Sequence, residues 1–262
     1  MEIAVCFKIV PDYEDVIPAD WEDMEHLDFS FVKKIYGCYD EAALETALRL
    51  KDALIEAKKP VHCVAVTAGE GPAALFTGLY AAGFNEVVCI SGEKTEFAPQ
   101  KTAEKLSAYL KEKNPDLILT GSMTGPCDSG MVPACLAKNM GWEWLTNVTD
   151  LCFHIEKERL EVWNQEAQFE VHRTLDFPAV CTIGDGKHPY LRIFSLKDRL
   201  EARKKTVTEW PGRMEEVKQL EESSLKAFSQ KKQENICCML ETDCVEETAK
   251  WLINMISGEV QQ

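Results

Sequence analysis

The sequence predicts an α/β protein in which a parallel sheet carries helices on both faces, and three observations lead to this prediction. Short apolar runs of strand length alternate with longer segments whose apolar residues recur at helical spacing. The short runs are almost continuously apolar, as expected for parallel strands that are buried on both faces. The chain has 262 residues and 45% hydrophobic content, which is enough for one large domain with a tail.

The first half of the chain supplies the strands and helices in alternation. We expect strands over residues 2–7, 61–67, 86–90 and 117–119, and helices over residues 40–54, 72–82, 102–113 and 128–139. Pro72 suits a first helical turn, while Gly83 and Gly141 stand where helices should end. Because strands and helices alternate, we expect a Rossmann-like sheet of the type found in adenine-nucleotide hydrolases.

The pattern changes after residue 150. Residues 151–163 and 167–175 predict an antiparallel pair around Asn164-Gln165, and residues 179–183 predict a last apolar strand. Residues 206–235 are polar and indicate an extended arm, which a short strand over 236–240 and a helix over 245–256 follow. We therefore expect an α/β domain over residues 1–205 and a C-terminal arm and helix over residues 206–262. The last element is too small to fold alone, so it should dock on another protein.

Composition and charge exclude several classes of protein. A formal net charge of −15 argues against nucleic acid as a partner. No apolar run approaches the ~20 residues that cross a bilayer, and the first residues lack the features of a signal peptide. The 11 cysteines are odd in number and include no Cys-x-x-Cys, while Cys6, Cys63, Cys89 and Cys181 lie in apolar runs. We expect reduced thiols, no metal site, and a cytoplasmic location.

Residues 116–133 contain the most informative motif. An apolar run ends at Thr120-Gly121, a loop of small and polar residues follows, and a helical pattern then begins. A strand, a small-residue loop and a helix N-terminus can hold a phosphate, because loop N–H groups and the helix dipole both favour an anion. The same pattern also occurs in tight turns that bind nothing.

No catalytic constellation stands out in the sequence. Gly-x-Ser-x-Gly, Walker-type Gly-Lys-Ser and a defensible Cys/His pair are all absent. Adenine-nucleotide hydrolases and ligases would need a Ser-Gly-Gly-x-Asp-Ser type of loop after the first strand, where this chain has Lys8-Ile9-Val10-Pro11. A stand-alone nucleotide-binding module similar to universal stress proteins is a second alternative, although such a module would not need the arm at 206–262.

Five segments together resemble one family. They are IAVCFKIVPD, DEAALETALRLKD, VAVTAGEGPAA, GSMTGPCDSG and FPAVCTIGDGKHP, and they occur in the order and spacing of the β subunit of electron transfer flavoproteins. The resemblance covers residues 1–205, with a similar arm and helix beyond. It implies a heterodimer with an α subunit that carries FAD, a site in this chain for AMP or a second FAD, and docking of the 206–262 segment on the α subunit. It also implies that flavin, rather than this chain's side chains, carries the electrons.

The resemblance places the expected nucleotide site on four segments. The residues are Cys6, Gly37, Cys38, Tyr39, Asp40, Ala68, Gly121, Ser122, Met123, Thr124, Gly125, Pro126, Cys127, Asp128, Ser129, Gly130, Met131 and Val132. These segments follow strand ends, where parallel sheets bind ligands. The chain departs from the family at Gly37-Cys38, where Asn-Pro is usual, and at Ser122-Met123, where Lys-Gln is usual. The choice between AMP, FAD and an empty site therefore stays open.

Several of these residues also have a purely structural interpretation. Asp40 could cap a helix, Cys6 could belong to the core, and Met123 and Met131 could serve packing. The loop at residues 186–194 resembles the segment with which the family recognises a flavin-dependent dehydrogenase, but its sequence differs. Its apolar Leu191, Ile193 and Phe194 should be exposed for docking, unless the loop folds back on its own sheet.

Overall fold

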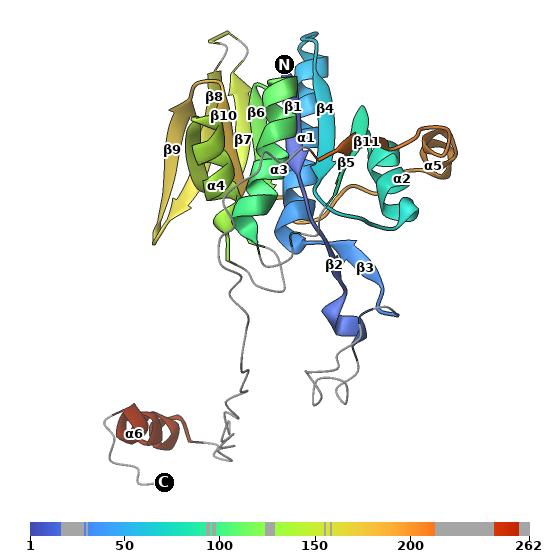
Figure 1. Ribbon diagram of the computed structural model, residues 1–262. Helices are drawn as coiled ribbons and strands as arrows, with labels where there is room; N and C mark the ends of the chain where they lie inside the picture. The colour runs from blue at the N-terminus through green and yellow to red at the C-terminus, as the bar shows by residue number, and fades with distance from the viewer. Residues whose placement is uncertain are drawn as a thin grey trace. The chain divides into compact units, whose positions relative to one another are not determined.

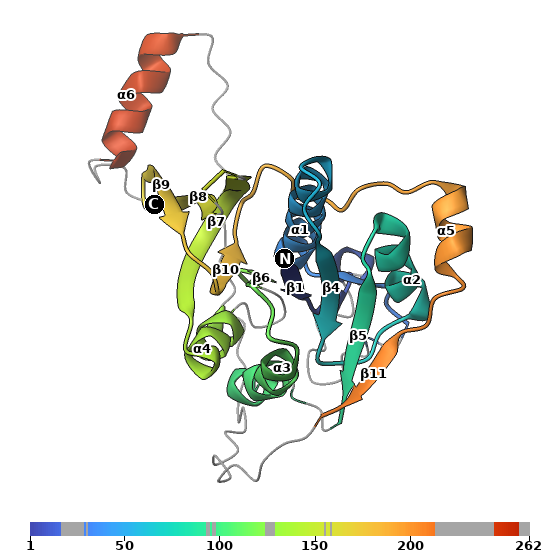
Figure 2. The same ribbon diagram turned by 90° about the horizontal axis from the view of Figure 1, so that it is seen from above.

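One sheet of nine strands organises the chain, and Figures 1 and 2 show helices on both of its faces. The computed structural model describes residues 1–16, 29, 31–92, 95, 98–123, 129–154, 156–157, 159–212 and 244–256. The strand order is β11-β5-β4-β1-β6-β10-β7-β8-β9. All neighbours from β11 to β7 run parallel, whereas β7, β8 and β9 pair antiparallel. The predicted α/β class, with a parallel sheet and added antiparallel strands, is confirmed.

The elements follow the apolar pattern of the sequence closely in the parallel part. The strands of the large sheet are β1 (Glu2–Cys6), β4 (His62–Thr67), β5 (Glu86–Ser91), β6 (Leu117–Gly121), β7 (Glu143–His154), β8 (Arg159–Glu166), β9 (Phe169–Leu175), β10 (Ala179–Ile183) and β11 (Thr208–Pro211). The helices are η1 (Tyr13–Asp15), α1 (Cys38–Glu56), α2 (Ala73–Ala82), α3 (Pro99–Lys113), α4 (Met131–Met140), α5 (Leu196–Ala202) and α6 (Val245–Ile256). A separate antiparallel ribbon joins β2 (Ile9–Pro11) to β3 (Lys34–Tyr36).

Two apolar layers cover the two faces of the sheet. On one face, α1 packs against alternate residues of the strands, such as Val5, Leu119 and Cys181, while α2 lies beside α1 and α5 packs against α2. On the other face, α3 and α4 pack against the residues between them, such as Ile118 and Val180. Because side chains alternate across a strand, both halves of each apolar run are buried. That is why these runs are continuous in the sequence.

The antiparallel extension differs from the prediction. The segment 151–163 is not one strand, because β7 ends at His154 and β8 begins at Arg159. Asn164 and Gln165 lie inside β8 rather than in a turn, and the turn to β9 contains Ala167 with φ +52°. Asn164 is buried and pairs with Val171, so its polarity misled the prediction.

The chain divides into two units, Met1–Glu216 and Val217–Gln262. In the first unit, residues 208–211 of the expected arm instead form β11, which pairs with β5. In the second unit the described element is α6, on which Val245 and Ile253 are exposed. The expected strand at 236–240 and most of the expected arm lie outside the described residues, and the proposed boundary at residue 205 stays a prediction. Among the described residues, no helix is long and apolar enough to cross a membrane.

Candidate functional site

The strand order reverses beside β1, at the carboxyl edge of the sheet. From β1 the chain moves to β4 and β5 on one side and then crosses back to β6 and β10 on the other. The carboxyl ends of β1 and β6 are therefore followed by connections that leave in opposite directions. Ligands of open α/β sheets bind at such a reversal point. The predicted site residues follow strand ends at this edge or lie at the starts of α1 and α4.

The Asp40 carboxylate fastens the two strand ends together. One carboxylate oxygen accepts a hydrogen bond from the backbone N–H of Lys8, after β1, at 3.2 Å. The other accepts from the N–H of Gly121, at the end of β6, at 3.3 Å. Asp40 is buried in the first turn of α1, whose N-cap is Gly37. The side chain thus joins the first turn of α1 to the ends of two strands.

Gly121 is needed where α1 crosses the end of β6. A Cβ atom at this position would lie 2.7 Å from Asp40 Oδ1, 2.8 Å from the Asp40 nitrogen and 2.9 Å from the Tyr39 carbonyl carbon. Two of these three atoms belong to backbone, so a side chain rotation could not relieve the contact. The close approach explains why the strand ends in glycine.

The connection from β6 to α4 returns to the same edge. The Ser122 N–H donates to the carbonyl of Ile183 at 2.9 Å, which fixes the start of the loop to β10. At its end, Gly130 has φ +59°, and a Cβ atom there would lie 3.0 Å from the Ser122 carbonyl oxygen. The Ser129 hydroxyl accepts from the Met131 N–H at 3.4 Å. The two ends of the loop are therefore close together, while Thr124, Gly125, Pro126, Cys127 and Asp128 lie outside the described residues.

Cys6 belongs to the core as well as to the edge. The residue is buried in the layer under α3 and α4, as its alternative interpretation predicted. Burial, together with the nearby Asp40 carboxylate, raises the pKa of the Cys6 thiol to about 12. Near neutral pH the group is a neutral thiol and a poor nucleophile. It can line a pocket, but it is not suited to covalent chemistry.

The remaining predicted residues differ in exposure. Cys38, Met123, Ser129 and Met131 are exposed, whereas Tyr39, Ala68, Ser122 and Val132 are half-buried. Met131 is the first residue of α4, and no acidic residue occupies the first turn of this helix. The N-terminus of α4 therefore keeps the positive end of its dipole uncompensated by its own first turn.

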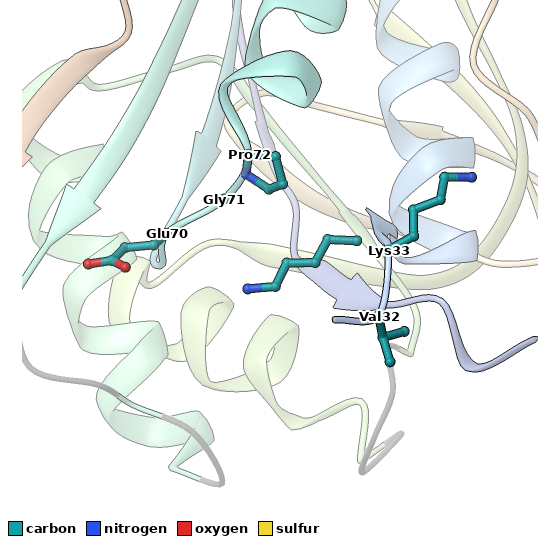
Figure 3. Close-up of a pocket in the computed structure, with 6 residues that line it drawn as sticks. Val32, Lys33, Glu70, Gly71 and Pro72 are labelled. Carbon is teal, nitrogen blue, oxygen red and sulfur yellow. The ribbon is translucent and has the colours of Figure 1, made fainter. Parts of the chain in front are cut away.

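A shallow hollow of about 450 Å³ lies between the segment at residues 32–34 and the loop after β4, and the sequence interpretation missed it (Figure 3). Val32, Lys33 and Lys34 line one side, and Glu70, Gly71 and Pro72 line the other. The second group belongs to the loop after β4, which also contains Ala68. The adjacent Lys33 and Lys34 are the feature of the sequence from which this hollow could have been predicted. None of the predicted site residues that the structure describes lines this hollow, and its open form and mixed charge indicate no specific ligand.

The loop at residues 186–194 is tied firmly to α1. The Arg192 guanidinium donates to both carboxylate oxygens of Glu45, at 3.0 and 3.1 Å, and its backbone N–H donates to the same carboxylate at 3.0 Å. A further bond of 2.6 Å reaches Asp52. The Glu45 side chain is 1% exposed and that of Arg192 29% exposed, so the carboxylate of this ion pair is buried and the guanidinium is half-buried. The loop cannot swing away from α1 without breaking this ion pair.

Only part of this loop is exposed, which corrects the sequence interpretation. Leu191 and Phe194 are half-buried against the core, and the Arg199 guanidinium lies over the Phe194 ring at 5.2 Å. Ile193, in contrast, is 99% exposed. Phe194 is therefore a packing residue, and Ile193 is the apolar side chain that the loop presents to solvent. Tyr190 and Leu196 are exposed on either side of it.

Among the residues that the structure describes, no group of His, Cys, Asp and Glu side chains is arranged to hold a metal ion. The conspicuous charged contacts join structural elements, as the Asp40 and Arg192 contacts do. The described part of the carboxyl edge thus combines backbone N–H groups, small residues and neutral side chains with the Asp40 carboxylate. Such an edge can bind and orient a ligand.

Comparison with known proteins gives consistent results over most of the chain. The family model described as electron transfer flavoprotein domain matches residues 34–213. The chain is 29% identical over 220 residues to the electron transfer flavoprotein subunit beta of Bradyrhizobium diazoefficiens, covering 80% of this chain and 81% of that protein. It is 26% identical over 154 residues to the putative electron transfer flavoprotein subunit YgcR of Escherichia coli strain K12, covering 56% and 58% respectively. The family match includes β6, α4 and the loop at 186–194.

Proposed function

The chain belongs to the electron transfer flavoprotein domain family and is similar to its β subunits, and from this premise we propose that it binds an adenine nucleotide, AMP or FAD, at the carboxyl edge of its sheet. The observation that carries the proposal is the β6–α4 connection. It starts and ends with small residues, lies at the point where strand order reverses, and leads into a helix N-terminus that has no acidic residue in its first turn. These are the features that favour a bound phosphate.

The residues at the carboxyl edge would hold a nucleotide mainly through backbone groups. Gly121 and Gly130 let the two ends of the connection pack closely against α1 and Ser122, and the N–H groups at the start of α4 would face the phosphate of a ligand. The side chains at the ends of β1 and β6 would line the site for the rest of the nucleotide. When FAD is bound, its isoalloxazine ring supplies the electron-transfer chemistry, whereas AMP would have a structural role. In either case this chain holds the nucleotide and performs no bond-making step itself.

We expect Met131→Glu to abolish nucleotide binding without harming the fold. The side chain is exposed in the first turn of α4, where a carboxylate stabilises a helix by about 0.3–1 kcal/mol. The same charge would repel a phosphate. A ligand present at about 100 times its Kd raises the free energy of unfolding by about 2.7 kcal/mol. Wild type should therefore show a clear rise of melting temperature with AMP or FAD, and Met131→Glu should show none.

Met131→Gln is the matched control, because it has the same shape as the glutamate variant without the charge. It should keep the nucleotide-dependent rise of melting temperature. If wild type gains no stability from AMP or FAD, or if Met131→Glu gains as much as wild type, the phosphate does not bind at α4.

We further propose an α subunit carrying FAD as the partner, with residues 206–262 docking on it, and a flavin-dependent dehydrogenase that docks on the 186–194 loop. The exposed apolar side chains of α6, such as Val245 and Leu252, support the first contact, because apolar side chains at a surface are suited to docking. Ile193 supports the second, because an almost fully exposed isoleucine on a firmly held loop is suited to docking. A cytoplasmic location remains part of this proposal.

For the docking loop, Ile193→Asp should slow electron transfer to the cognate dehydrogenase at least tenfold, because a buried apolar anchor can carry ~2 kcal/mol of binding. The melting temperature should not change, since the Ile193 side chain is 99% exposed. The assay uses the co-expressed complex with the α subunit. Phe169→Asp, which alters an exposed aromatic residue on β9, serves as control and should transfer electrons at the wild-type rate. If Ile193→Asp transfers electrons at the normal rate, the dehydrogenase does not dock on this loop. If the chain elutes without an α subunit after co-expression, the proposal of an α-subunit partner is wrong.

A further inference from the structure

Three polar side chains form a row across adjacent strands next to the proposed nucleotide site. Cys6 of β1 is in register with Thr120 of β6, which is in register with Thr182 of β10. Side chains alternate along strands, so Thr120 shares the face of Ile118, which is covered by α3 and α4. The row is therefore the last layer of this face before the carboxyl edge. It lies on the side of the sheet to which the β6–α4 loop returns.

The Thr120 hydroxyl is the member of this row that lacks a partner. Thr120 is 4% exposed, and its oxygen has no hydrogen-bond partner among the described residues. Thr182, its neighbour on β10, already accepts a hydrogen bond of 2.8 Å from the indole N–H of Trp144. Buried hydroxyl groups almost always have partners, since leaving one without a partner costs free energy. A valine would fill the same space at no such cost, so the hydroxyl calls for a specific explanation.

The surroundings of Thr120 favour an uncharged ligand group. The Cys6 thiol beside it stays protonated near neutral pH, because its pKa is raised to about 12 by burial and by the Asp40 carboxylate. The same carboxylate would repel an anion at this level of the sheet. The N-terminus of α4 instead attracts an anion. The edge is thus divided between a place for a phosphate and a place for a neutral, partly apolar group.

We propose that the Thr120 hydroxyl hydrogen-bonds the uncharged nucleoside part of the ligand, its purine base or ribose, while the α4 N-terminus holds the phosphate. The inference rests on the proposed nucleotide site and adds a specificity-determining residue to it. In this arrangement the buried hydroxyl is complemented when the ligand enters. Cys6 supplies a neutral surface against which the base packs.

The test combines Thr120→Val with two ligands, AMP and adenosine, whose affinities for the full chain are measured by calorimetry. Thr120→Val keeps the shape of the side chain and should weaken both ligands by a similar factor of about three to ten. Thr120→Ser keeps the hydroxyl and should bind both close to wild type. Met131→Glu should weaken AMP strongly and leave adenosine unchanged. The two substitutions therefore separate the nucleoside contact from the phosphate contact.

The melting temperature of the ligand-free protein distinguishes a ligand contact from a structural role of Thr120. If the hydroxyl stabilised the fold, Thr120→Val would lower the melting temperature. Removing an unpartnered buried hydroxyl should leave free Thr120→Val with the same or a higher melting temperature. A lower melting temperature, unchanged affinity for both ligands, or a loss confined to AMP would each overturn the assignment of Thr120. Absence of any AMP or FAD binding by wild type would instead overturn the proposed nucleotide site, and this inference with it.

Discussion

Arg192→Leu should lower the free energy of unfolding by about 3–5 kcal/mol, the usual cost of removing one partner from a buried ion pair. Glu45 is 1% exposed and accepts three hydrogen bonds from Arg192, two from the guanidinium and one from the backbone. Arg49 also lies 2.9 Å from this carboxylate but is half exposed, so it compensates only partly and the effect should fall near the lower limit. For a unit of this size, the melting temperature should fall by about 6–12 °C.

Three further variants make the ion-pair prediction specific. Arg159→Leu breaks an exposed pair with Asp176 and should cost at most about 1 kcal/mol. Arg192→Lys keeps the charge but loses the planar fork, so it should lie between wild type and Arg192→Leu. The double variant Glu45→Leu/Arg192→Leu should be more stable than Arg192→Leu alone, because no buried charge is then left without its partner. If the double variant is the least stable of the set, the cost comes from lost packing of the loop.

The same ion pair explains why the structure of the 186–194 loop was predictable only in part. The apolar residues Leu191, Ile193 and Phe194 look alike in sequence, so the pattern predicts either that all three are exposed or that the whole loop folds back on its sheet. Arg192 reaches back 147 positions to Glu45, and this long-range contact decides which neighbours face the core. Nothing in the local pattern encodes that choice. It turns Leu191 and Phe194 inward and leaves Ile193 outside.

Elements with continuous apolar runs were predictable, and half-exposed ones were not. β1, β4, β6 and β10 are buried on both faces, so each reads as a short apolar block. The first half of β7 contains exposed Glu143 and Trp144, and a register shift between Val148 and Asp150 interrupts its alternation. β11 is a polar edge strand of four residues that depends on β5 for its hydrogen bonds. Strands of this kind depend on their neighbours more than on their own composition.

The candidate site shows the same division between local and long-range information. Small residues around Gly121 and Gly130 could be recognised from the sequence, because close backbone approach requires them. The partners of Asp40 could not, since Gly121 lies 81 positions away. The unpartnered hydroxyl of Thr120 was also invisible, because threonine suits a buried strand equally well when it has a partner.

Asp40→Ala should destabilise the protein by about 3 kcal/mol. The substitution removes a buried carboxylate that accepts from two backbone N–H groups, those of Lys8 and Gly121. Hydrogen bonds to a charged group contribute about 1.5–3 kcal/mol each, and buried donors left without partners add a desolvation cost. Water entering the space should recover part of this loss. Chemical denaturation measures the effect, with an unchanged m-value as the sign that the fold itself persists.

Asp40→Asn is the matched control, and Gly121→Ala completes a double-mutant cycle. The asparagine keeps one accepting oxygen but turns an NH₂ group toward the second N–H, so it should recover about half of the loss. Gly121→Ala should itself cost about 1–3 kcal/mol or more through overpacking. Two of its three close contacts are to backbone of Tyr39 and Asp40, which Asp40→Ala leaves in place. The cost of Gly121→Ala should therefore fall only in part in the Asp40→Ala background. If the effects of the two substitutions are fully additive, the carboxylate and Gly121 do not interact. The claim that Asp40 joins β1, β6 and α1 would then be wrong.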